Sequence, residues 1–295
     1  MSDITAALAA NAREVDATLD RLLPLHNDTD TRLLEAIRYS TLSGGKRIRP
    51  FLVLSGANLF GVSREFALRA AAAVEMVHCY SLIHDDLPAM DNDTLRRGMP
   101  TNHIKFDEAT AILAGDGLLT RAFEVLADPA THSDPRVRAN LVVELARASG
   151  VDGMVGGQML DLLAEHRTLS MAEVTRMQRM KTGALIAFSC DAGAILGKGG
   201  DSARHSLRAY AHDLGLAFQI VDDLLDVEGD TETVGKMTGK DSNAGKATFV
   251  SLLGVERARA QSAMLARQAV EHLAIFDAAA DPLRALANYI VARRI

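Results

Sequence analysis

Two aspartate-rich segments carry the residue types and spacing best suited to metal and phosphate chemistry. The first is HDDLPAMDND, residues 84–93, which follows a long apolar stretch. Pro88 disfavours helical backbone at Leu87, so a helix should end there with Asp85 and Asp86 in its last turn. Acids are unfavourable at that end of the helix dipole, and neighbouring carboxylates repel one another. The segment is therefore either a solvated acidic turn capped by the arginines that follow, or a set of hard oxygen ligands for Mg²⁺.

The second segment places several acids on one side of an apolar helix. Gln219, Asp222, Asp223 and Asp226 are spaced i, i+3, i+4 and i+7, which brings them onto one helix face. Like charges at this spacing destabilise a helix by roughly 0.2–0.5 kcal/mol per pair. The flanking residues are apolar, so a solvated face does not explain the acids. The pattern predicts a buried or cleft-facing metal site.

A basic loop, GGKRIRP, occupies residues 44–50. Flexible glycines precede three cations, and Pro50 suits the first position of a helix. Backbone N–H groups, a helix N-terminus and guanidinium forks together favour an anion site. The alternative is an ordinary basic loop between helices, which is plausible only if the loop is considered alone.

Further cations accompany the acidic segments. Lys181 and Thr182 lie within an apolar helical stretch, and Lys236, Lys240 and Lys246 follow the second acidic segment in glycine-containing sequence. These residues are either solvated surface groups or the charges that neutralise a phosphate held by Mg²⁺.

Two histidines precede the first acidic segment. His78 lies two turns before it and is either a satisfied core residue or a ligand. His84 is discounted as a ligand, because its side chain should point about 100° away from that of Asp85.

The composition narrows the class of protein. Hydrophobic residues make up 48% of the 295 residues and charged residues 24%, which excludes wholesale disorder. The formal charge of −6 argues against nucleic-acid or anionic-membrane binding. We find no signal peptide and no run of about 18 apolar residues, so we expect no membrane span. The only cysteines, Cys79 and Cys190, suit a reducing compartment, and we expect a cytoplasmic protein.

The hydrophobic pattern has a helical period along almost the whole chain. Few prolines, 4% aromatics and abundant alanine favour helix over sheet, and no hairpin signal lies between β-branched runs. We expect helices over 3–22, 30–42, 50–59, 63–87, 106–127, 134–149, 153–166, 170–196, 201–228, 244–277 and 281–293. The connections are short, so the prediction is one all-α domain over residues 1–295. It should be a single large helical bundle whose central cleft is shared by both acidic segments.

Taken together, these segments resemble those of the trans-isoprenyl diphosphate synthases. DDLPAMDND followed by two arginines resembles the first aspartate-rich motif of that family, FQIVDDLLD resembles the second, and both occur in the family's order. Four residues separate Asp86 from Asp91, as in the bacterial short-chain members, and YSLIHDDLPAMDND is most similar to the bacterial farnesyl diphosphate synthases. The resemblance runs closely over residues 44–246 and more loosely over the whole length.

The resemblance implies an enzyme, a prenyltransferase of the isoprenoid synthase fold. The implied reaction condenses isopentenyl diphosphate head to tail with dimethylallyl and then geranyl diphosphate, by ionisation, condensation and elimination, giving farnesyl diphosphate. Three Mg²⁺ ions, or Mn²⁺ in their place, are implied at each active site, with Asp85, Asp91 and Asp222 as ligands and Asp86 and Asp226 in support. No histidine is expected to act as the base, because the released diphosphate is thought to take the proton in this family.

The same resemblance assigns two diphosphate sites. The residues implied for isopentenyl diphosphate are Gly45, Lys46, Arg49, His78 and Arg97. The residues implied for the allylic diphosphate are Arg96, Lys181, Thr182, Gln219, Lys236 and Lys246. The catalytic set is Asp85, Asp86, Asp91, Asp222 and Lys181. Near the end of the chain, Arg293 and Arg294 either cover the isopentenyl site or form a solvated basic tail.

Product length is implied by residues about one turn before Asp85. An aromatic residue at Tyr80, with Ser81 beside it, resembles a floor that stops chain growth at fifteen carbons. Tyr80 could equally be a packed core residue with its hydroxyl satisfied, and both interpretations can hold together. A geranyl or geranylgeranyl diphosphate synthase of the same family is the alternative.

Three other classes compete with a synthase. A class I terpene cyclase shares the fold and Mg²⁺, but cyclases guide cations with aromatic faces, and this chain has no Trp. A non-catalytic partner subunit should have lost acids from one motif, and both are intact here. A helical scaffold without a ligand leaves the acids of the second segment uncompensated. By resemblance, and because two-fold dimers are the commonest oligomers, we expect a homodimer.

Overall fold

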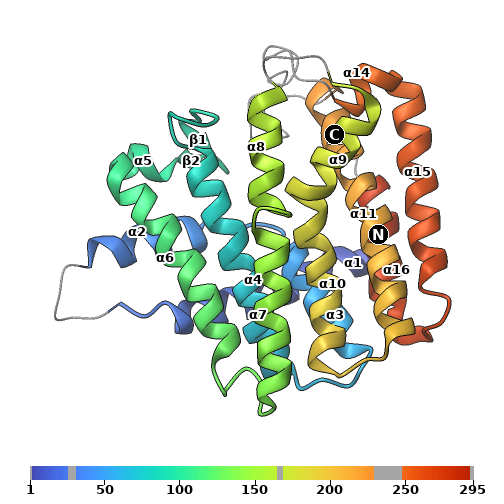
Figure 1. The fold of residues 1–295 in the computed structure, drawn as a ribbon, viewed down its shortest axis with the longest axis horizontal. Coiled ribbons are helices and arrows are strands. Elements are labelled where there is room, and N and C mark those ends of the chain that lie inside the picture. The colour runs from blue at the N-terminus through green and yellow to red at the C-terminus, as the bar shows by residue number, and fades with distance from the viewer. Residues whose placement is uncertain (1, 26–30, 165–168, 229–247, 293–295) are drawn as a thin grey trace.

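The computed structural model describes residues 2–25, 31–164, 169–228 and 248–292, and these are almost wholly helical (Figure 1). The elements are α1 (Ser2–Leu22), α2 (Arg32–Thr41), α3 (Ile48–Asn58), α4 (Arg64–Asp85), β1 (Leu95–Arg96), β2 (Met99–Pro100), α5 (Asn102–Lys105), α6 (Glu108–Ala127), α7 (Pro135–Ser149), α8 (Met154–Ala164), α9 (Met171–Gln178), the π-helix η1 (Arg179–Gly183), α10 (Ala184–Leu196), α11 (Asp201–Glu228), α14 (Phe249–Leu253), α15 (Val255–His272), the 3-10 helix η2 (Ala278–Ala280) and α16 (Asp281–Ala292). The all-α bundle expected from the sequence is confirmed.

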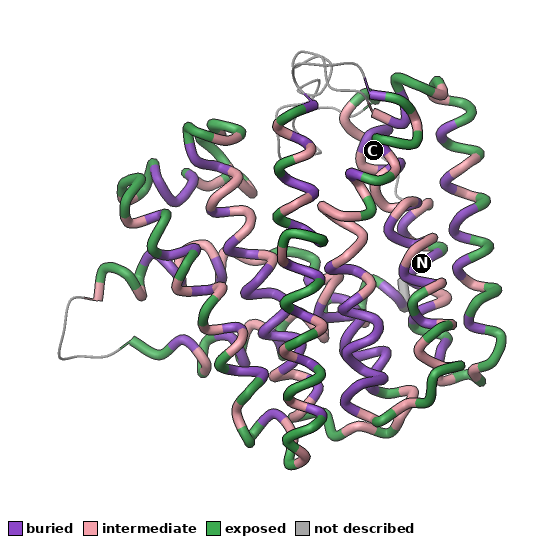
Figure 2. Tube along the Cα trace, in the orientation of Figure 1, coloured by how far each residue is buried: buried purple, intermediate pink, exposed green. Residues whose placement is uncertain are grey.

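The two helices that carry the acidic segments are held by shared neighbours. α4 packs against α3, α6 and α10, and α11 packs against α10 and α15. Figure 2 shows buried residues running through α4 and α10, whereas α8 and α15 present exposed residues on their outer sides. By length and composition alone α4 could cross a membrane, but 67% of that stretch is buried inside the bundle. α4 is thus packed as a core helix.

Small residues let the central helices approach closely. In α4, the run from Ala70 to Ala73 is fully buried. In α10, a Cβ added at Gly193 would lie 2.2 Å from the backbone nitrogen of Ala57 in α3 and 2.3 Å from the carbonyl carbon of Gly56. The backbones of α3 and α10 therefore touch, and this contact fixes α10 between α4 and α11.

Most predicted helices are present, with two corrections to their bounds. The helix expected over 170–196 is divided into α9, η1 and α10 by a five-residue π-helical stretch. The helix expected over 244–277 is divided into α14 and α15, because Gly254 has a positive φ of 78° and ends the first. Its predicted start, 244–247, lies outside the described residues.

A short antiparallel hairpin follows α4, although no strand was expected. Leu95 pairs with Pro100, and Arg96 pairs with Met99. The two turn residues, Arg97 and Gly98, have φ values of 54° and 76°. Positive φ at both central residues is the geometry that tight hairpins favour, but Arg-Gly is not one of the usual sequence signals for it. The hairpin was missed for that reason.

One of the cations of the basic loop belongs to the core. The Arg47 side chain is fully buried and binds Glu75 of α4, with 2.5 Å between Nη1 and Oε1. It also donates to the Thr41 carbonyl oxygen and to Asp16 of α1. Arg47 therefore ties the loop to α1 and α4. The expectation that all three cations of the loop serve an anion site was wrong for Arg47.

The Arg47–Glu75 pair yields a stability prediction. Glu75→Gln leaves the buried guanidinium without its full counter-charge, and breaking such a pair lowers the free energy of unfolding by about 3–5 kcal/mol. Glu14→Gln is the control, because Glu14 pairs with Arg64 at the surface, where each side chain is about half exposed. That change should cost less than about 1 kcal/mol. Equal losses for both variants in urea denaturation would contradict the buried role of Arg47.

Candidate active site

A cavity of about 710 Å³ lies between α4, α8, η1 and α11. It is lined by Arg49, His78, Tyr80, Ser81, Leu82, His84, Asp85, Met90, Asp91, Arg96, Arg97, Met154, Val155, Gln158, Met159, Leu162, Lys181, Thr182, Phe218, Gln219 and Asp222. The fold thus brings both acidic segments, part of the basic loop and the Lys181 region to one space. Among the predicted residues that the structure describes, Gly45, Lys46, Asp86 and Asp226 do not line it.

The end of α4 presents two carboxylates to the cavity. The backbone N–H of Asp91 donates to the Asp85 carbonyl oxygen at 2.8 Å, so the turn folds back over the helix end. Burial raises the pKa of Asp85 to about 6; nearby Lys181 opposes this shift, and Asp91 adds to it. A cation in the cavity would favour the charged form of Asp85.

Asp86 is directed away from the cavity and paired. Arg96 of β1 holds it in a fork, with Nε–Oδ1 and Nη2–Oδ1 distances of 2.8 Å and 2.6 Å. The Asp86 side chain is only 4% exposed. Arg96 also lines the cavity, so one arginine both neutralises Asp86 and presents its charge to the site. The structure thus separates Asp86 from Asp85 and Asp91.

The second acidic segment is divided between two environments. Gln219 and Asp222 line the cavity. Asp223 instead accepts hydrogen bonds from the Phe249 backbone N–H at 2.9 Å and from Gln219 Nε2 at 3.0 Å. The prediction that all four polar residues share one functional face was therefore wrong for Asp223, which supports the start of α14, and for Asp226, which does not line the cavity.

Three cationic or imidazole groups face the cavity near the basic loop. They are Arg49, His78 and Arg97. Burial lowers the pKa of Arg49, and its Nε has no hydrogen-bond partner within the described ranges. Burial, with Arg49 and Arg97 nearby, holds the pKa of His78 well below its usual value. His78 is therefore neutral at pH 7 and can donate or accept a hydrogen bond without adding charge.

The Arg97 side chain packs against Gly45 of the basic loop. Gly45 has φ of 132°, and a Cβ there would lie 2.9 Å from the Arg97 guanidinium carbon. Arg97 also donates to the Gly44 carbonyl oxygen. Only glycine allows this approach, so the loop and the hairpin turn position Arg97 together. Lys46 is exposed beside them.

Lys181 and Thr182 project from η1, where the helix is widened. Lys181 Nζ binds Asp161 of α8, and Thr182 Oγ1 lies 3.3 Å from Gln219 Oε1. Asp161 is 10% exposed and was not predicted as a site residue. An acid within an apolar helical stretch, in the sequence GGQMLD, is the signal that marks it.

The rest of the cavity wall is largely apolar. Tyr80 is 5% exposed, and its hydroxyl has no hydrogen-bond partner among the described residues, so the satisfied hydroxyl considered from the sequence is not found. Burial raises the pKa of Tyr80 to about 12. His84, discounted from the sequence, packs edge to face on Tyr80 with 5.7 Å between ring centroids. Its Nε2 lies 3.0 Å from the Ile112 carbonyl oxygen, which fixes the ring beside the cavity.

Four predicted residues fall outside the described part of the chain. They are Lys236, Lys246, Arg293 and Arg294, and Lys240, the further cation named with the first two, lies outside it as well.

The hard oxygen donors fit a metal shared with a substrate. Within the described ranges, no group of three or more His, Cys, Asp or Glu side chains converges as a closed metal cage. Asp85 at the end of α4, Asp91 in the turn that follows and Asp222 of α11 instead face one cavity. Mg²⁺ is usually bound by one or two carboxylates together with waters and substrate phosphates. The separated carboxylates, with cations beside them, therefore fit Mg²⁺ and a diphosphate together.

Known proteins have similar sequences and a similar fold. The polyprenyl synthetase family matches residues 30–280. Farnesyl diphosphate synthase of Escherichia coli K12 is 46% identical over 99% of each chain. Geranylgeranyl pyrophosphate synthase 3 of Arabidopsis thaliana is 45% identical over 99% of this chain and 82% of that protein. The crystal structure of an FPP/GFPP synthase from Zymomonas mobilis has a TM-score of 0.90 and 48% identity, covering 99% of each chain.

An all-α bundle with carboxylates and cations around one deep cavity defines an enzyme of the isoprenoid synthase fold. The chain belongs to the polyprenyl synthetase family and is a prenyltransferase. The family and enzyme class inferred from the aspartate-rich motifs are confirmed.

The Lys181–Asp161 contact yields a prediction about a positioning residue. Asp161→Asn removes the charge that holds Lys181 toward the cavity, and misplacing such a group by about 1 Å lowers the rate of prenyl transfer by roughly 10²-fold. We expect a higher KM for the allylic diphosphate and little change in KM for isopentenyl diphosphate. If Asp161 only stabilised the fold, its replacement would not raise the KM for one substrate and leave the KM for the other unchanged.

Asp152→Asn is the control for this experiment, because Asp152 is exposed just before α8. Its steady-state constants should match those of the unchanged protein. If Asp161→Asn alters both KM values equally, or neither, Asp161 does not position Lys181.

Proposed function

We propose that this chain is a farnesyl diphosphate synthase. It condenses isopentenyl diphosphate with dimethylallyl diphosphate and then with geranyl diphosphate, by ionisation, condensation and elimination. One observation carries the proposal: a single cavity joins charged groups suited to diphosphate at one end to an apolar wall bounded by Tyr80. The E. coli relative of that name supports the same activity.

Mg²⁺ is the proposed cofactor, with three ions per active site and Mn²⁺ as a possible substitute. Asp85, Asp91 and Asp222 would hold the ions, which neutralise the charge that develops on the leaving diphosphate. Lys181 and Thr182 orient the allylic diphosphate from η1. The further residues proposed to support this site are Arg96, Gln219, Lys236, Lys246, Asp86 and Asp226.

Isopentenyl diphosphate is proposed to bind at the basic side of the cavity. Arg49 and Arg97 supply the charge, and the unpartnered Nε of Arg49 gives one donor for the anion. Neutral His78 adds a hydrogen bond, while Gly45 contributes its backbone N–H and exposed Lys46 closes the outer edge. Guanidinium forks suit this task because they bind phosphate oxygens in pairs.

The proposed reaction needs cations at the end of the cavity that holds the diphosphates, and an apolar environment without water at the end that holds the growing hydrocarbon chain. The carbon–oxygen bond to the allylic diphosphate breaks, and the apolar wall keeps water from the carbocation. The double bond of isopentenyl diphosphate then attacks, forming the new carbon–carbon bond. One proton leaves the adjacent carbon, and the released diphosphate takes it. The protein thus orients both substrates and excludes water.

Product length is the main alternative within the family. The geranylgeranyl pyrophosphate synthase of Arabidopsis is nearly as similar as the E. coli farnesyl diphosphate synthase. Fifteen carbons are favoured here because Tyr80 is buried and braced by His84 at the cavity wall. A terpene cyclase is disfavoured, since Tyr80 and Phe218 are the only Phe, Tyr or Trp side chains among the cavity-lining residues that the structure describes.

We further propose that the chain is one cytoplasmic domain that works as a homodimer. Both aspartate-rich helices contribute to one cavity, which supports a single domain. Large apolar side chains are exposed on adjacent helices, including Ile112 and Leu113 of α6 and Val143 of α7, which supports a second copy as partner.

Asp222 provides the sharpest test of the metal proposal. Asp222→Asn keeps the size of the side chain but removes its charge, so turnover should fall by about 10²-fold or more. The measurement is steady-state turnover with isopentenyl diphosphate, the allylic diphosphate and Mg²⁺ all saturating. Asp201→Asn, at the exposed start of the same helix, is the control and should be unchanged. Near-normal turnover for Asp222→Asn would rule out its role as a metal ligand.

Tyr80 tests the length of the product. Tyr80→Ala removes the ring that bounds the cavity, so products of twenty carbons or more should form, as measured by mass spectrometry. Tyr80→Phe keeps the ring and should keep the fifteen-carbon product, because the hydroxyl has no partner among the described residues. Tyr289→Ala on α16 is the control. A farnesyl-only profile from Tyr80→Ala would contradict the proposed floor.

A further inference from the structure

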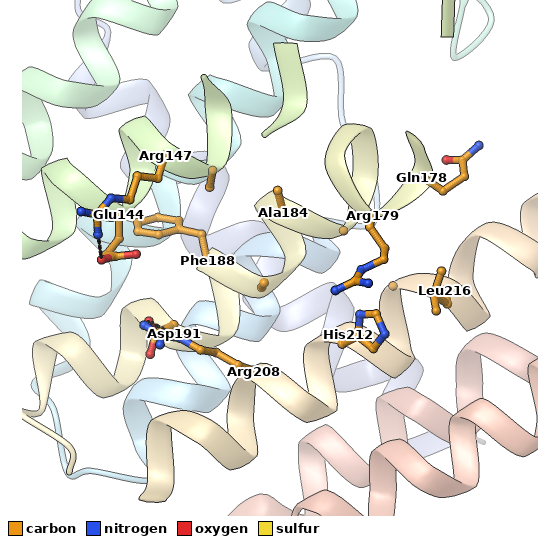
Figure 3. Close-up of a pocket in the computed structure, with 14 residues that line it drawn as sticks. Glu144, Arg147, Gln178, Arg179, Ala184, Phe188, Asp191, Arg208, His212 and Leu216 are labelled. Carbon is orange, nitrogen blue, oxygen red and sulfur yellow. Dashed lines mark hydrogen bonds and ion pairs between the residues drawn. The ribbon is translucent and has the colours of Figure 1, made fainter. Parts of the chain in front are cut away.

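A second cavity, of about 370 Å³, lies on the opposite side of η1, between α7, α10 and α11 (Figure 3). We call it the rear cavity. None of its lining residues also lines the catalytic cavity. The π-helical turn and α11 border both spaces. In the turn, Lys181 and Thr182 face the catalytic cavity, whereas Arg179 and Gly183 face the rear one. The rear cavity is therefore a separate space that the prenyl-transfer reaction does not use.

The floor of the rear cavity is apolar. Ala184, Ala187 and Phe188 line it from α10, and Leu216 lines it from α11. Small side chains on α10 leave room above the helix, and Figure 3 shows Phe188 lying between the charged groups of α7 and α10. A hydrocarbon group of a few carbons would bury apolar surface here.

The rim of the rear cavity carries cations, most of which are already paired. Arg147 binds Glu144 at 2.8 Å, and Arg208 binds Asp191 at 2.7 Å. Arg179 differs, because within the described ranges it forms no ion pair and no side-chain hydrogen bond.

The imidazole of His212 lies beside the Arg179 guanidinium. Figure 3 shows Arg179 extending toward His212 of α11. Burial lowers the pKa of His212, and the charge of Arg179 lowers it further. His212 is therefore a neutral hydrogen-bonding group at pH 7, next to a guanidinium that still has its five donors available.

We propose that the rear cavity is a second ligand site, which binds an amphipathic anion. A phosphate or carboxylate head would bind Arg179 and His212, and a short hydrocarbon part would lie along Ala184, Ala187 and Leu216. A bare inorganic anion leaves the apolar floor unused, and a neutral hydrocarbon leaves Arg179 without a counter-charge. A ligand with both an anionic head and a hydrocarbon part matches the cations of the rim and the apolar floor together.

The test uses n-hexyl phosphate as the probe, in isothermal titration calorimetry of the full chain without Mg²⁺. Inorganic phosphate and 1-hexanol are measured alongside, and each should bind at least about tenfold more weakly, because each makes only part of the contact. Arg179→Gln should weaken hexyl phosphate binding by about tenfold or more, since hydrogen bonds to charged groups contribute about 1.5–3 kcal/mol.

Arg176→Gln is the matched control. Arg176 is also exposed, lies three residues earlier and does not line the rear cavity. Its affinity for the probe should be unchanged. Because Arg179 is exposed and has no ion pair within the described ranges, its variant should fold normally, and an unchanged thermal midpoint would verify this.

Arg49→Gln distinguishes the rear cavity from the catalytic one, which also attracts phosphates. We expect Arg49→Gln to retain the binding that Arg179→Gln loses. The opposite pattern would place the probe in the catalytic cavity and overturn the proposal. So would no measurable binding, or equal affinity for hexyl phosphate and inorganic phosphate. None of these outcomes bears on prenyl transfer, which is assayed separately.

Discussion

The whole arrangement depends on confining like charges at the edge of an apolar interior. Asp85 ends a helix whose core face is packed with alanine, and burial raises its pKa to about 6 while Lys181 opposes the shift. Carboxylates in such a place are favourable only when cations accompany them. The acids that turn away from the cavity have protein donors: Arg96 binds Asp86, and the Phe249 N–H binds Asp223. The acids that face the cavity lie where a ligand can bring further cations to them.

The bundle holds these charges through rigid contacts rather than through the site itself. Backbone contact at Gly193 fixes α10 between the two aspartate-bearing helices. The buried Arg47–Glu75 pair anchors the basic loop to α4. The π-helical turn then widens the backbone where Lys181 projects, and Asp161 aims the amine. The two aspartate-bearing helices, the basic loop and the Lys181 amine thus have separate structural supports.

Much of this could be predicted from spacing, and the remainder depends on tertiary contacts. The helical period of the hydrophobic residues predicted the all-α bundle. Pro88 predicted that a helix ends at the first acidic segment, and α4 does end there. Spacing could not separate Asp86 from its neighbours, because its partner Arg96 lies on a hairpin whose turn has no usual sequence signal. It also could not connect Asp161 with Lys181, since twenty residues and a helix boundary separate them. Spacing also could not separate Arg47 from Arg49, which are two residues apart. Arg47 points into the core and pairs with Glu75, whereas Arg49 lines the cavity.

We propose that this cavity couples diphosphate ionisation to chain growth that stops at fifteen carbons. The most direct measurement incubates the purified protein with Mg²⁺, isopentenyl diphosphate and dimethylallyl diphosphate, and then identifies the allylic products by mass. We expect farnesyl diphosphate as the end product, with geranyl diphosphate as its precursor, and no reaction after chelation of the metal. An end product of twenty carbons would contradict the role given to Tyr80, and the absence of any allylic product would contradict the account as a whole.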